Sequence, residues 1–235
     1  MKEGKIFFIG DSITRGIVRE NSAYRVIPDS FVTRFGELVK TEIINLGQFG
    51  NNSRRILERL ERFGITAGDI VFLQIGGNDC DFNWDIISRE PEGDFDPSVP
   101  KEDFGKNLSA IFEYLLRRGI NTAAINMPPL HPEKYFDFIS HGRSPDNILK
   151  WLRSKGRIYS HHETFNKILE ETAISFGIGI VDIRRRILLS DNYEELVCED
   201  GIHPNAAGHE VIYKEILRFI IGKTFGPRGR AHMLA

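Results

Sequence analysis

Cysteine is scarce in this chain: its 235 residues include only Cys80 and Cys198. Two cysteines cannot form a disulfide framework, and free thiols favour a reducing compartment. The cysteines have no zinc-binding spacing, and the seven histidines contain no HExxH motif. His161 and His162 are adjacent, so on a helix their side chains point in different directions and cannot bind one metal ion. We therefore predict two free thiols and no metal site.

Concentrated positive charge is also missing. The 31 Lys and Arg residues nearly balance the 33 Asp and Glu residues, and the net charge is −2. Without a sustained basic run, the sequence predicts no nucleic-acid partner. The richest basic cluster, Arg184 to Arg186, follows an apolar run, and we expect it to be a solvated surface.

Long apolar runs are absent as well. No run approaches the length of a membrane-spanning helix, so we predict no membrane insertion. The first residues, MKEGKIFFIGDS, contain an apolar stretch that is too short for the core of a signal peptide, and they lack a small-residue cleavage site. These features predict a cytoplasmic protein. The sequence does not indicate its oligomeric state.

Short apolar runs alternate with longer amphipathic segments along the chain. Each run is nearly continuous in hydrophobicity, as expected for a strand that is buried on both faces. The predicted strands are 5–10, 41–47, 69–77, 121–127 and 177–183, and the predicted helices are 31–39, 53–63, 101–118, 159–176 and 205–221. This alternation predicts a five-stranded parallel sheet in a three-layer α/β/α sandwich of the flavodoxin-like kind. We expect 1–222 to form a single domain and 223–235 a loose C-terminal tail.

Two long segments, 80–100 and 128–150, do not fit the alternation. Both are rich in proline, aspartate and aromatic residues, and each leaves the carboxyl end of a predicted strand. Loops of this length in a compact domain are usually functional or mobile. They are expected either to wall a substrate pocket, with or without closing over it, or to be surface excursions with local packing.

The stretch FIGDSIT places Ser12 directly after an apolar run. A serine at a strand-to-helix junction can be the N-cap of the helix, and this stretch taken alone favours that role. The same position suits a nucleophile, because the unpaired backbone N–H groups at a helix N-terminus stabilise a developing oxyanion. Ligands of parallel α/β sheets bind at the carboxyl ends of the strands, where Ser12 is expected.

Two glycine-containing turns follow other predicted strands. In NLGQFGNNS, Gly50 has no side chain to block the approach of its backbone N–H to the strand ends, although the stretch also fits an ordinary flexible turn. In QIGGNDC, Asn78 offers a side-chain amide donor at the same edge of the sheet. An asparagine in a turn usually bonds to its own backbone, so its place after a central strand is what favours a functional role.

The stretch CEDGIHPNAAGHEV holds Asp200 and His203 three residues apart, before the last predicted helix. In such a turn the carboxylate can accept from one imidazole nitrogen while the other nitrogen faces a neighbouring group. That arrangement fixes the tautomer and orientation of a general base. A capped helix with a surface histidine is the alternative for this stretch alone. A parallel sheet would bring this pair together with the nucleophile and donor candidates.

Taken together, the four stretches resemble the SGNH hydrolases, also called the GDSL esterase/lipase family. That family carries a serine, a glycine, an asparagine and a histidine in four separated blocks, and all four occur here in order. The resemblance implies that Ser12 is the nucleophile, Asp200 the triad acid and His203 the base. It also implies an oxyanion hole made by Ser12, Gly50 and Asn78. The resemblance covers nearly the whole chain and implies the same flavodoxin-like sandwich.

The sequence differs from the family's pattern in the first block and leaves the register open in the second. Ile13 stands where the eponymous leucine of the family's first block stands, which is a mild apolar change. In the second block, Gly47 competes with Gly50 for the oxyanion role if the register differs. The GxSxG turn of the α/β-hydrolases is absent around Ser12.

The implied reaction is ester hydrolysis through an acyl-enzyme on Ser12, with no metal or organic cofactor. The substrate is expected to be a small-molecule ester with a short acyl group, such as an O-acetylated carbohydrate. A lipase or thioesterase for longer acyl chains is one alternative. A non-catalytic module that binds a sugar or phosphate on the same fold is the other.

Several residues of the two long segments and nearby are candidates for binding the substrate. Asp81 and Trp84 would give a polar pocket with an aromatic platform, and Tyr24 and Asn83 would fit the same role. His131 is a further candidate, with a solvated loop histidine as its alternative. The acidic, polar character of the loops favours a carbohydrate ester over a long acyl chain.

Overall fold

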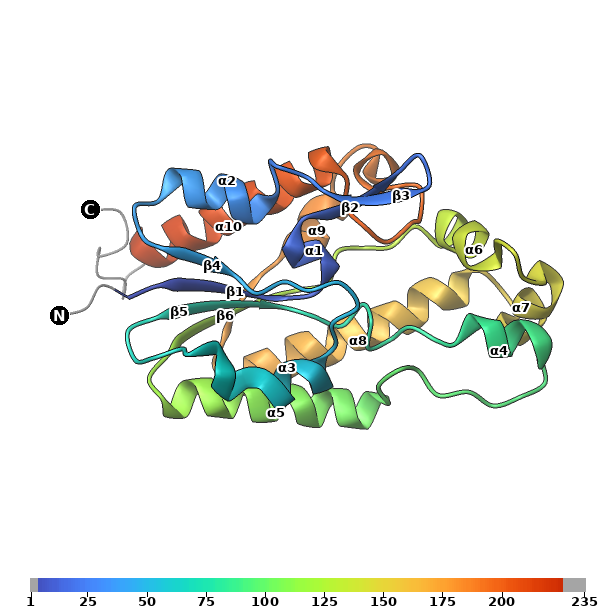
Figure 1. The fold of residues 1–235 in the computed structure, drawn as a ribbon, viewed down its shortest axis with the longest axis horizontal. Helices are drawn as coiled ribbons and strands as arrows, with labels where there is room; N and C mark the ends of the chain where they lie inside the picture. The colour runs from blue at the N-terminus through green and yellow to red at the C-terminus, as the bar shows by residue number, and fades with distance from the viewer. Residues whose placement is uncertain (1–3, 226–235) are drawn as a thin grey trace.

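The computed structural model describes residues 4–225, with side chains described to Gly222, and contains a five-stranded parallel sheet. In sheet order the strands are β4 (Ile43–Asn45), β1 (Ile6–Gly10), β5 (Ile70–Gln74), β6 (Asn121–Ile125) and β7 (Gly179–Val181). The sheet lies between two layers of helices (Figure 1). The predicted α/β/α sandwich is confirmed, and each strand falls within one of the five predicted runs.

The two faces of the sheet bury alternate residues of the same strand. In β1, Phe7 and Ile9 belong to one apolar cluster and Ile6 and Phe8 to the other. The first face is covered by α3 (Ser53–Arg59), α5 (Lys101–Arg117) and α8 (Gly156–Ser175), and the second by α2 (Phe31–Leu38), α9 (Ile183–Leu188) and α10 (Ala206–Phe225). The central strands β1 and β5 are almost entirely apolar because both of their faces are buried.

The predicted helix starts at residues 31, 53 and 101 are confirmed, and the start at 205 is off by one residue. Gly64, Gly119 and Gly177 each adopt a positive φ just after a helical segment, where glycine has no steric penalty. The 53–63 helix continues after α3 as the 3₁₀ turn η1 (Leu60–Phe63), and α8 starts before the predicted residue 159. Helix α10 continues past Gly222 to Phe225, and the rest of the predicted tail, 226–235, lies outside the described residues.

Several elements were not predicted. A hairpin of β2 (Ile17–Glu20) and β3 (Ala23–Val26) follows the short helix α1 (Ser12–Arg15), and the 3₁₀ turn η2 (Tyr193–Leu196) precedes the last block. The segment 80–100 contains α4 (Trp84–Arg89), and the second long segment contains α6 (Pro132–Ser140) and most of α7 (Pro145–Leu152).

The helices of the two long segments form a separate apolar cluster. In Figure 1, α4, α6 and α7 extend beyond the carboxyl ends of the strands. Their buried side chains, which include Trp84, Tyr135 and Ile148, pack on one another rather than on the sheet. This packing forms a second small core beyond the edge of the sheet where Ser12 lies. It therefore favours a pocket wall, which is the first of the two alternatives for these segments.

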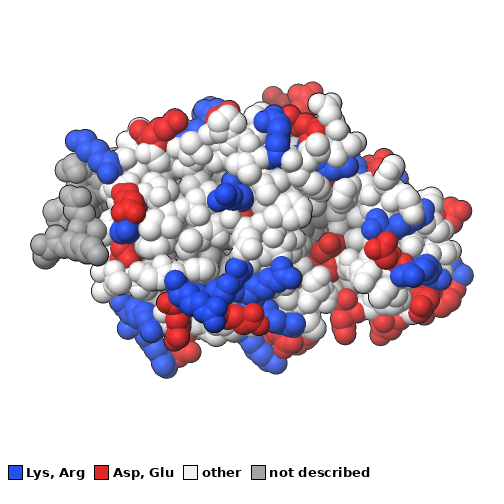
Figure 2. All heavy atoms as spheres, in the orientation of Figure 1, with Lys and Arg blue, Asp and Glu red and all other residues white. Residues whose placement is uncertain are grey.

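The expectation for the arginine cluster was wrong at one position. Arg184 is buried, because its guanidinium pairs with Glu163 at 2.5 Å and lies over the ring of Tyr159. Arg185 and Arg186 are exposed as expected. On the face drawn in Figure 2, basic and acidic side chains are interspersed over a largely uncharged surface, with one basic group near the lower edge.

No helix between residues 4 and 225 is long and apolar enough to cross a membrane.

Candidate active site

Ser12, His203 and Asp200 form a continuous line of hydrogen bonds at the carboxyl edge of the sheet. His203 Nε2 lies 2.8 Å from Ser12 Oγ, and His203 Nδ1 lies 2.6 Å from Asp200 Oδ2. All three side chains are almost completely buried, and Asp200 has no exposed surface. Residues that are far apart in the sequence are therefore within proton-transfer distance of one another.

The sequence around Ser12 forces a tight turn from strand to helix. Strand β1 ends at Gly10, where a Cβ atom would lie only 2.1 Å from Thr14 Oγ1 and 2.4 Å from the Gln74 carbonyl oxygen. Asp11 is the N-cap of α1, since its Oδ1 accepts from the Ile13 N–H at 2.9 Å. The N-cap role considered for Ser12 was wrong: Ser12 is the first helical residue, and its hydroxyl is left to face His203.

Asp200 is held in place by the turn that it begins. Its Oδ1 accepts from the backbone N–H groups of Ile202 and His203, both at 3.1 Å, while its Oδ2 faces the imidazole. Burial alone would raise the pKa of Asp200, but the His203 hydrogen bonds and charge outweigh burial, and the pKa is lowered. The carboxylate is therefore charged when the imidazole beside it gains a proton.

Gly201 allows this turn to pack against the helices above the site. It has a positive φ of 76°, and a Cβ atom there would lie 2.4 Å from the Tyr135 backbone nitrogen. The His131 N–H also donates to the Gly201 carbonyl oxygen at 2.8 Å. The Asp–His turn thus depends on α6, which comes from the second long segment.

The two candidate glycines differ in the state of their N–H groups. The Gly47 N–H donates to Asn45 Oδ1 at 2.8 Å, and a Cβ atom on Gly47 would lie 2.3 Å from the Arg15 nitrogen. The Gly50 N–H has no hydrogen-bond partner among residues 4–225, and Gly50 lines a large cavity. Only Gly50 combines a free N–H with access to the site, so it is favoured over Gly47.

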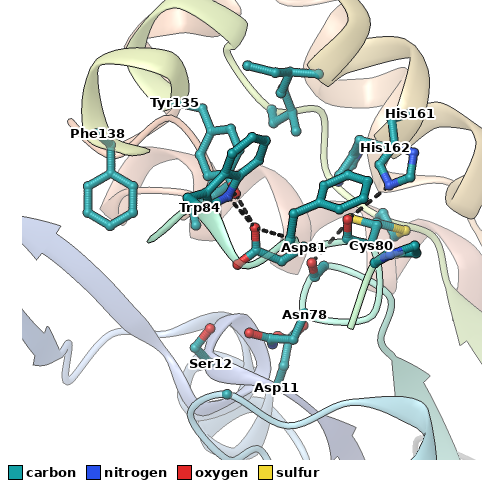
Figure 3. A pocket seen from close by; sticks show the side chains of 18 of the residues that line it. Asp11, Ser12, Asn78, Cys80, Asp81, Trp84, Tyr135, Phe138, His161 and His162 are labelled. Carbon is teal, nitrogen blue, oxygen red and sulfur yellow. Dashed lines mark hydrogen bonds between the residues drawn. The ribbon is translucent and has the colours of Figure 1, made fainter. Parts of the chain in front are cut away.

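Asn78 faces the same space as Ser12. One N–H of its side-chain amide donates to the Asn51 carbonyl oxygen at 2.9 Å, which leaves the second N–H available. Figure 3 shows Asn78 beside Ser12 and Asp11 at the floor of the cavity. The Ser12 N–H also lacks a partner within the described part of the chain. Three N–H donors, from Ser12, Gly50 and Asn78, therefore lack partners in the described part of the chain, and all three residues line the same cavity.

Two buried carboxyl groups flank these donors. Burial raises the pKa of Asp11 from 3.8 to about 6, although the Ile13 N–H and the charge of His203 oppose the shift. Burial also raises the pKa of Asp79 to about 6, against hydrogen bonds from the Ser53 hydroxyl and N–H. Asp79 thereby fixes the start of α3, while Asp11 adds negative charge near His203.

Asp11 is expected to reduce stability at neutral pH. The folded protein holds the Asp11 proton more tightly than the unfolded chain does. The stability that this proton adds is fully present below pH 3.8 and is lost as the pH rises through about 6. An Asp11→Asn variant keeps an oxygen that can accept from Ile13. We expect it to be more stable than the wild type by about 2–3 kcal/mol above this range.

Thermal unfolding at a series of pH values measures this effect. The gain of Asp11→Asn should shrink toward zero as the pH falls below the ordinary carboxyl range. Asp85→Asn is the matched control, because Asp85 is exposed and hydrogen-bonded to Arg143, which lowers its pKa. An equal gain for Asp11→Asn at all pH values would contradict the assigned titration.

A cavity of about 570 Å³ opens above Ser12 and His203. Asp11, Ser12 and Asn78 form its floor, and the cluster built by α4, α6 and α7 forms much of its wall (Figure 3). The wall is rich in aromatic side chains: Phe82, Trp84, Phe95, Tyr135, Phe138 and Trp151. Tyr24, on the unpredicted hairpin, also lines the cavity and packs its ring against Phe49 and His203.

Some of the candidate substrate-binding residues line the cavity and others do not. Asp81, Trp84 and Tyr24 line the cavity. Asn83 does not; its side chain caps α4 by accepting from the Ile86 N–H.

His131 also lies outside the cavity lining, which corrects its assignment as a substrate-binding residue. Its Nδ1 accepts from the Lys134 N–H as the N-cap of α6, and its Nε2 lies 3.2 Å from Glu194 Oε1. A histidine before a proline-started helix carries this capping signal in the sequence, but the nearby carboxylate comes from a distant segment. The alternative of a solvated loop histidine is wrong too, since His131 is buried.

Sequence reasoning missed most of the aromatic wall. Phe82, Tyr135 and Trp151 come from three separate segments. The sequence around each of them alone indicates only a residue that packs locally. The excess of aromatic residues in the two long segments was the available signal.

The two cysteines and the metal-ligating side chains form no further site in the described part of the chain. Cys80 and Cys198 are free thiols, as predicted. Both are also buried, and burial raises the pKa of both thiols, that of Cys198 to about 11. Between residues 4 and 225, no group of three His, Cys, Asp or Glu side chains is placed to hold a metal ion.

The fold and the arrangement of Ser12, His203 and Asp200 are those of the SGNH class of hydrolases. The profile of the GDSL-like lipase/acylhydrolase family matches residues 8–211, and the chain belongs to that family. It is thereby an enzyme of the carboxylic ester hydrolase class, which excludes a module that only binds. This confirms the resemblance inferred from the four sequence blocks.

Individual proteins agree with this assignment. The Arabidopsis thaliana GDSL esterase/lipase CPRD49 is 26% identical over 187 residues, which cover 77% of this chain and 67% of that protein. The lipase/acylhydrolase of Enterococcus faecalis is 18% identical, with a TM-score of 0.62 over 93% of this chain and 96% of that one. An acetyl xylan esterase from Geobacillus stearothermophilus is 19% identical, with a TM-score of 0.61 over 94% and 97%. The two solved structures are similar in fold.

Proposed function

We propose that this protein is a serine ester hydrolase that works through an acyl-enzyme on Ser12. The observation that carries this proposal is the continuous line from Ser12 Oγ to His203 Nε2 and from His203 Nδ1 to Asp200. His203 takes the hydroxyl proton as Ser12 attacks the ester carbonyl carbon. Asp200 holds the imidazole in the required tautomer and stabilises the imidazolium that forms.

The tetrahedral intermediate needs donors for its oxyanion. We assign this role to the backbone N–H groups of Ser12 and Gly50 and to the second amide N–H of Asn78, because these donors lack partners beside the serine. His203 then gives its proton to the leaving alcohol oxygen as the bond to the acyl carbon breaks. A water molecule repeats the cycle on the acyl-enzyme, which releases the acid and restores Ser12.

Asn78→Ala is expected to lower kcat by about 10²–10³ while the protein stays folded. The variant removes one oxyanion donor and leaves the Ser12–His203–Asp200 line intact. Steady-state hydrolysis of an acetyl ester measures the loss. Asn192→Ala is the control, because Asn192 is exposed and its side chain hydrogen-bonds only to Glu195 among the described residues. A loss for Asn78→Ala no larger than that of the control would remove Asn78 from the oxyanion hole.

The substrate class that the cavity favours is a short acyl ester of a carbohydrate. A volume of about 570 Å³ accepts a monosaccharide or disaccharide unit. Aromatic rings and the carboxylate of Asp81 line the wall, and the rim carries Asp94, Asp96 and Glu102 beside Lys101 and Arg157. That the similar fold from Geobacillus stearothermophilus belongs to an acetyl xylan esterase adds weight. The aromatic wall also suits a longer acyl chain, which keeps a lipase or thioesterase as the second candidate.

An ester panel separates the two candidates. Nitrophenyl esters of increasing acyl length, run beside acetylated methyl xyloside and acetylated glucose, give kcat/KM for each substrate. The carbohydrate proposal predicts a maximum at acetate or propionate and turnover of the acetylated sugars. A maximum at medium or long acyl chains, with no turnover of the sugars, would instead establish the lipase or thioesterase.

We further propose a cytoplasmic location, which the two free and buried thiols favour.

A further inference from the structure

Asp81 carries one carboxylate oxygen that the fold uses and one that it does not. Its Oδ1 accepts from the Phe82 N–H at 2.9 Å, the Trp84 indole N–H at 2.8 Å and the Tyr135 hydroxyl at 2.5 Å. No residue between 4 and 225 donates to its Oδ2. A carboxylate oxygen that is left without a donor inside a cavity is costly unless a ligand or water supplies one.

The unused oxygen faces the substrate space. In Figure 3, three dashed lines meet at one oxygen of Asp81, and the other oxygen points toward the space above Ser12 and Asn78. Asp81 and Tyr24 both line the cavity. The three donors on Oδ1 also fix the rotation of the carboxylate, so the direction of Oδ2 is set before a substrate binds.

The surroundings indicate which donor Asp81 meets. A quaternary ammonium would need open aromatic faces around the carboxylate. Here the rings pack edge to face on one another, with Trp84 against Phe82 at 5.6 Å, against Trp151 at 6.1 Å and against Tyr135 at 6.2 Å. Their mutual packing leaves no open cage, whereas a neutral hydroxyl needs only the accepting oxygen beside an apolar wall.

We propose that Asp81 determines specificity by accepting, through Oδ2, a hydrogen bond from a hydroxyl on the alcohol part of the ester. The preferred substrate is then a partly acetylated sugar that keeps a free hydroxyl near the scissile bond. This inference rests on the proposed ester hydrolase activity at Ser12. Trp84 and Tyr135 act as positioning residues, since their donors orient the carboxylate.

Two acetyl esters of similar shape test the proposal. Acetylated methyl glucoside has ring hydroxyls, and cyclohexyl acetate has the six-membered ring without them. Because a hydrogen bond to a charged group is involved, we expect the wild type to prefer the glucoside in kcat/KM by about 10- to 150-fold. A ratio near one, with measurable turnover of both esters, would overturn this inference and leave the ester hydrolase proposal standing. No turnover of any ester in the panel, whether acetyl or longer acyl, would overturn both.

Asp81→Asn inverts the recognition with little change in shape. The three donors keep the amide oxygen in the Oδ1 position, so the amide N–H₂ takes the place of Oδ2 and a donor faces the cavity. We expect the glucoside-to-cyclohexyl ratio to fall at least about tenfold. Asp85→Asn, an exposed change on α4 outside the cavity, should keep the wild-type ratio.

Two results would contradict the assigned role. An equal loss of Asp81→Asn on both esters would show that Asp81 supports only the structure of the wall. Acetylcholine and its neutral analogue 3,3-dimethylbutyl acetate test the charge alone. A loss confined to acetylcholine would show that Asp81 binds a cation, because a trimethylammonium group has no N–H or O–H to donate.

Discussion

Replacing Ser12 by alanine is expected to lower kcat for acetyl esters by about 10⁶-fold, the scale found when a serine hydrolase loses its nucleophile. Among residues 4–225 the Ser12 hydroxyl contacts only His203, so the variant loses the attacking oxygen and this one hydrogen bond. The protein should therefore unfold at a temperature close to that of the wild type. Hydrolysis of nitrophenyl acetate and a thermal unfolding curve measure the two properties.

A second serine provides the control for this result. Ser190 lies outside the cavity lining, and among residues 4–225 its hydroxyl contacts only the Arg186 carbonyl oxygen. Ser190→Ala should hydrolyse the ester at the wild-type rate. Hydrolysis by a folded Ser12→Ala protein within tenfold of the wild type would mean that another group attacks the ester.

Asp200→Asn has the second-largest expected effect, a fall in kcat of about 10⁴-fold. The amide can replace the carboxylate in size, but its N–H₂ group would donate to His203 Nδ1. The imidazole would then carry its proton on Nε2, facing Ser12, and could not accept the hydroxyl proton. Because Asp200 acts through His203 and does not touch the substrate, the loss should fall on kcat with KM nearly unchanged.

Kinetics and stability together separate this role from a structural one. The Oδ1 contacts to the Ile202 and His203 N–H groups remain possible in the variant, so the turn should persist. Asp191→Asn, at a surface position outside the cavity, is the matched change of charge. A variant that keeps its kcat, or one that loses activity only through a rise in KM, would be inconsistent with Asp200 as the partner of the base.

The sequence predicts the sheet and the reactive groups because both follow from local rules. Runs such as 69–77 are apolar at nearly every position, which is what burial on both faces requires, and parallel strands bring their carboxyl ends to one edge. This edge is where Ser12 follows β1 and Asn78 follows β5, and the Asp200–His203 turn packs against it. Their proximity is thus a consequence of topology, and the structure brings them together at hydrogen-bond distances.

The cavity wall could not be predicted in the same way. Helices α4, α6 and α7 are short, and their buried residues contact one another across three segments, so no single stretch carries a periodic signal. The hairpin β2–β3 escapes detection for a related reason. Strand β3 is exposed along its whole length, and the turn at Asn21 and Ser22 uses two positive φ values without a glycine.

The structure corrected three interpretations of single residues. In each of them the deciding contact comes from a residue distant in sequence or from the side chain of the neighbouring residue. Ser12 was a credible N-cap until the structure placed Asp11 in that role. His131 was a credible pocket residue until Glu194 and the start of α6 accounted for its ring. Arg184 was expected at the surface, but Glu163 and Tyr159 stabilise its buried guanidinium. In each case the deciding contact is one that composition and spacing cannot specify.

The most direct measurement of the central claim is to locate the covalent adduct formed by a fluorophosphonate probe. Peptide mass spectrometry of the labelled wild type should show one adduct, on the peptide that contains Ser12. His203→Ala should react far more slowly because its serine has no base, and Ser12→Ala should carry no adduct. An adduct on any other residue of the wild type, or labelling that persists in Ser12→Ala, would contradict the assignment of the nucleophile.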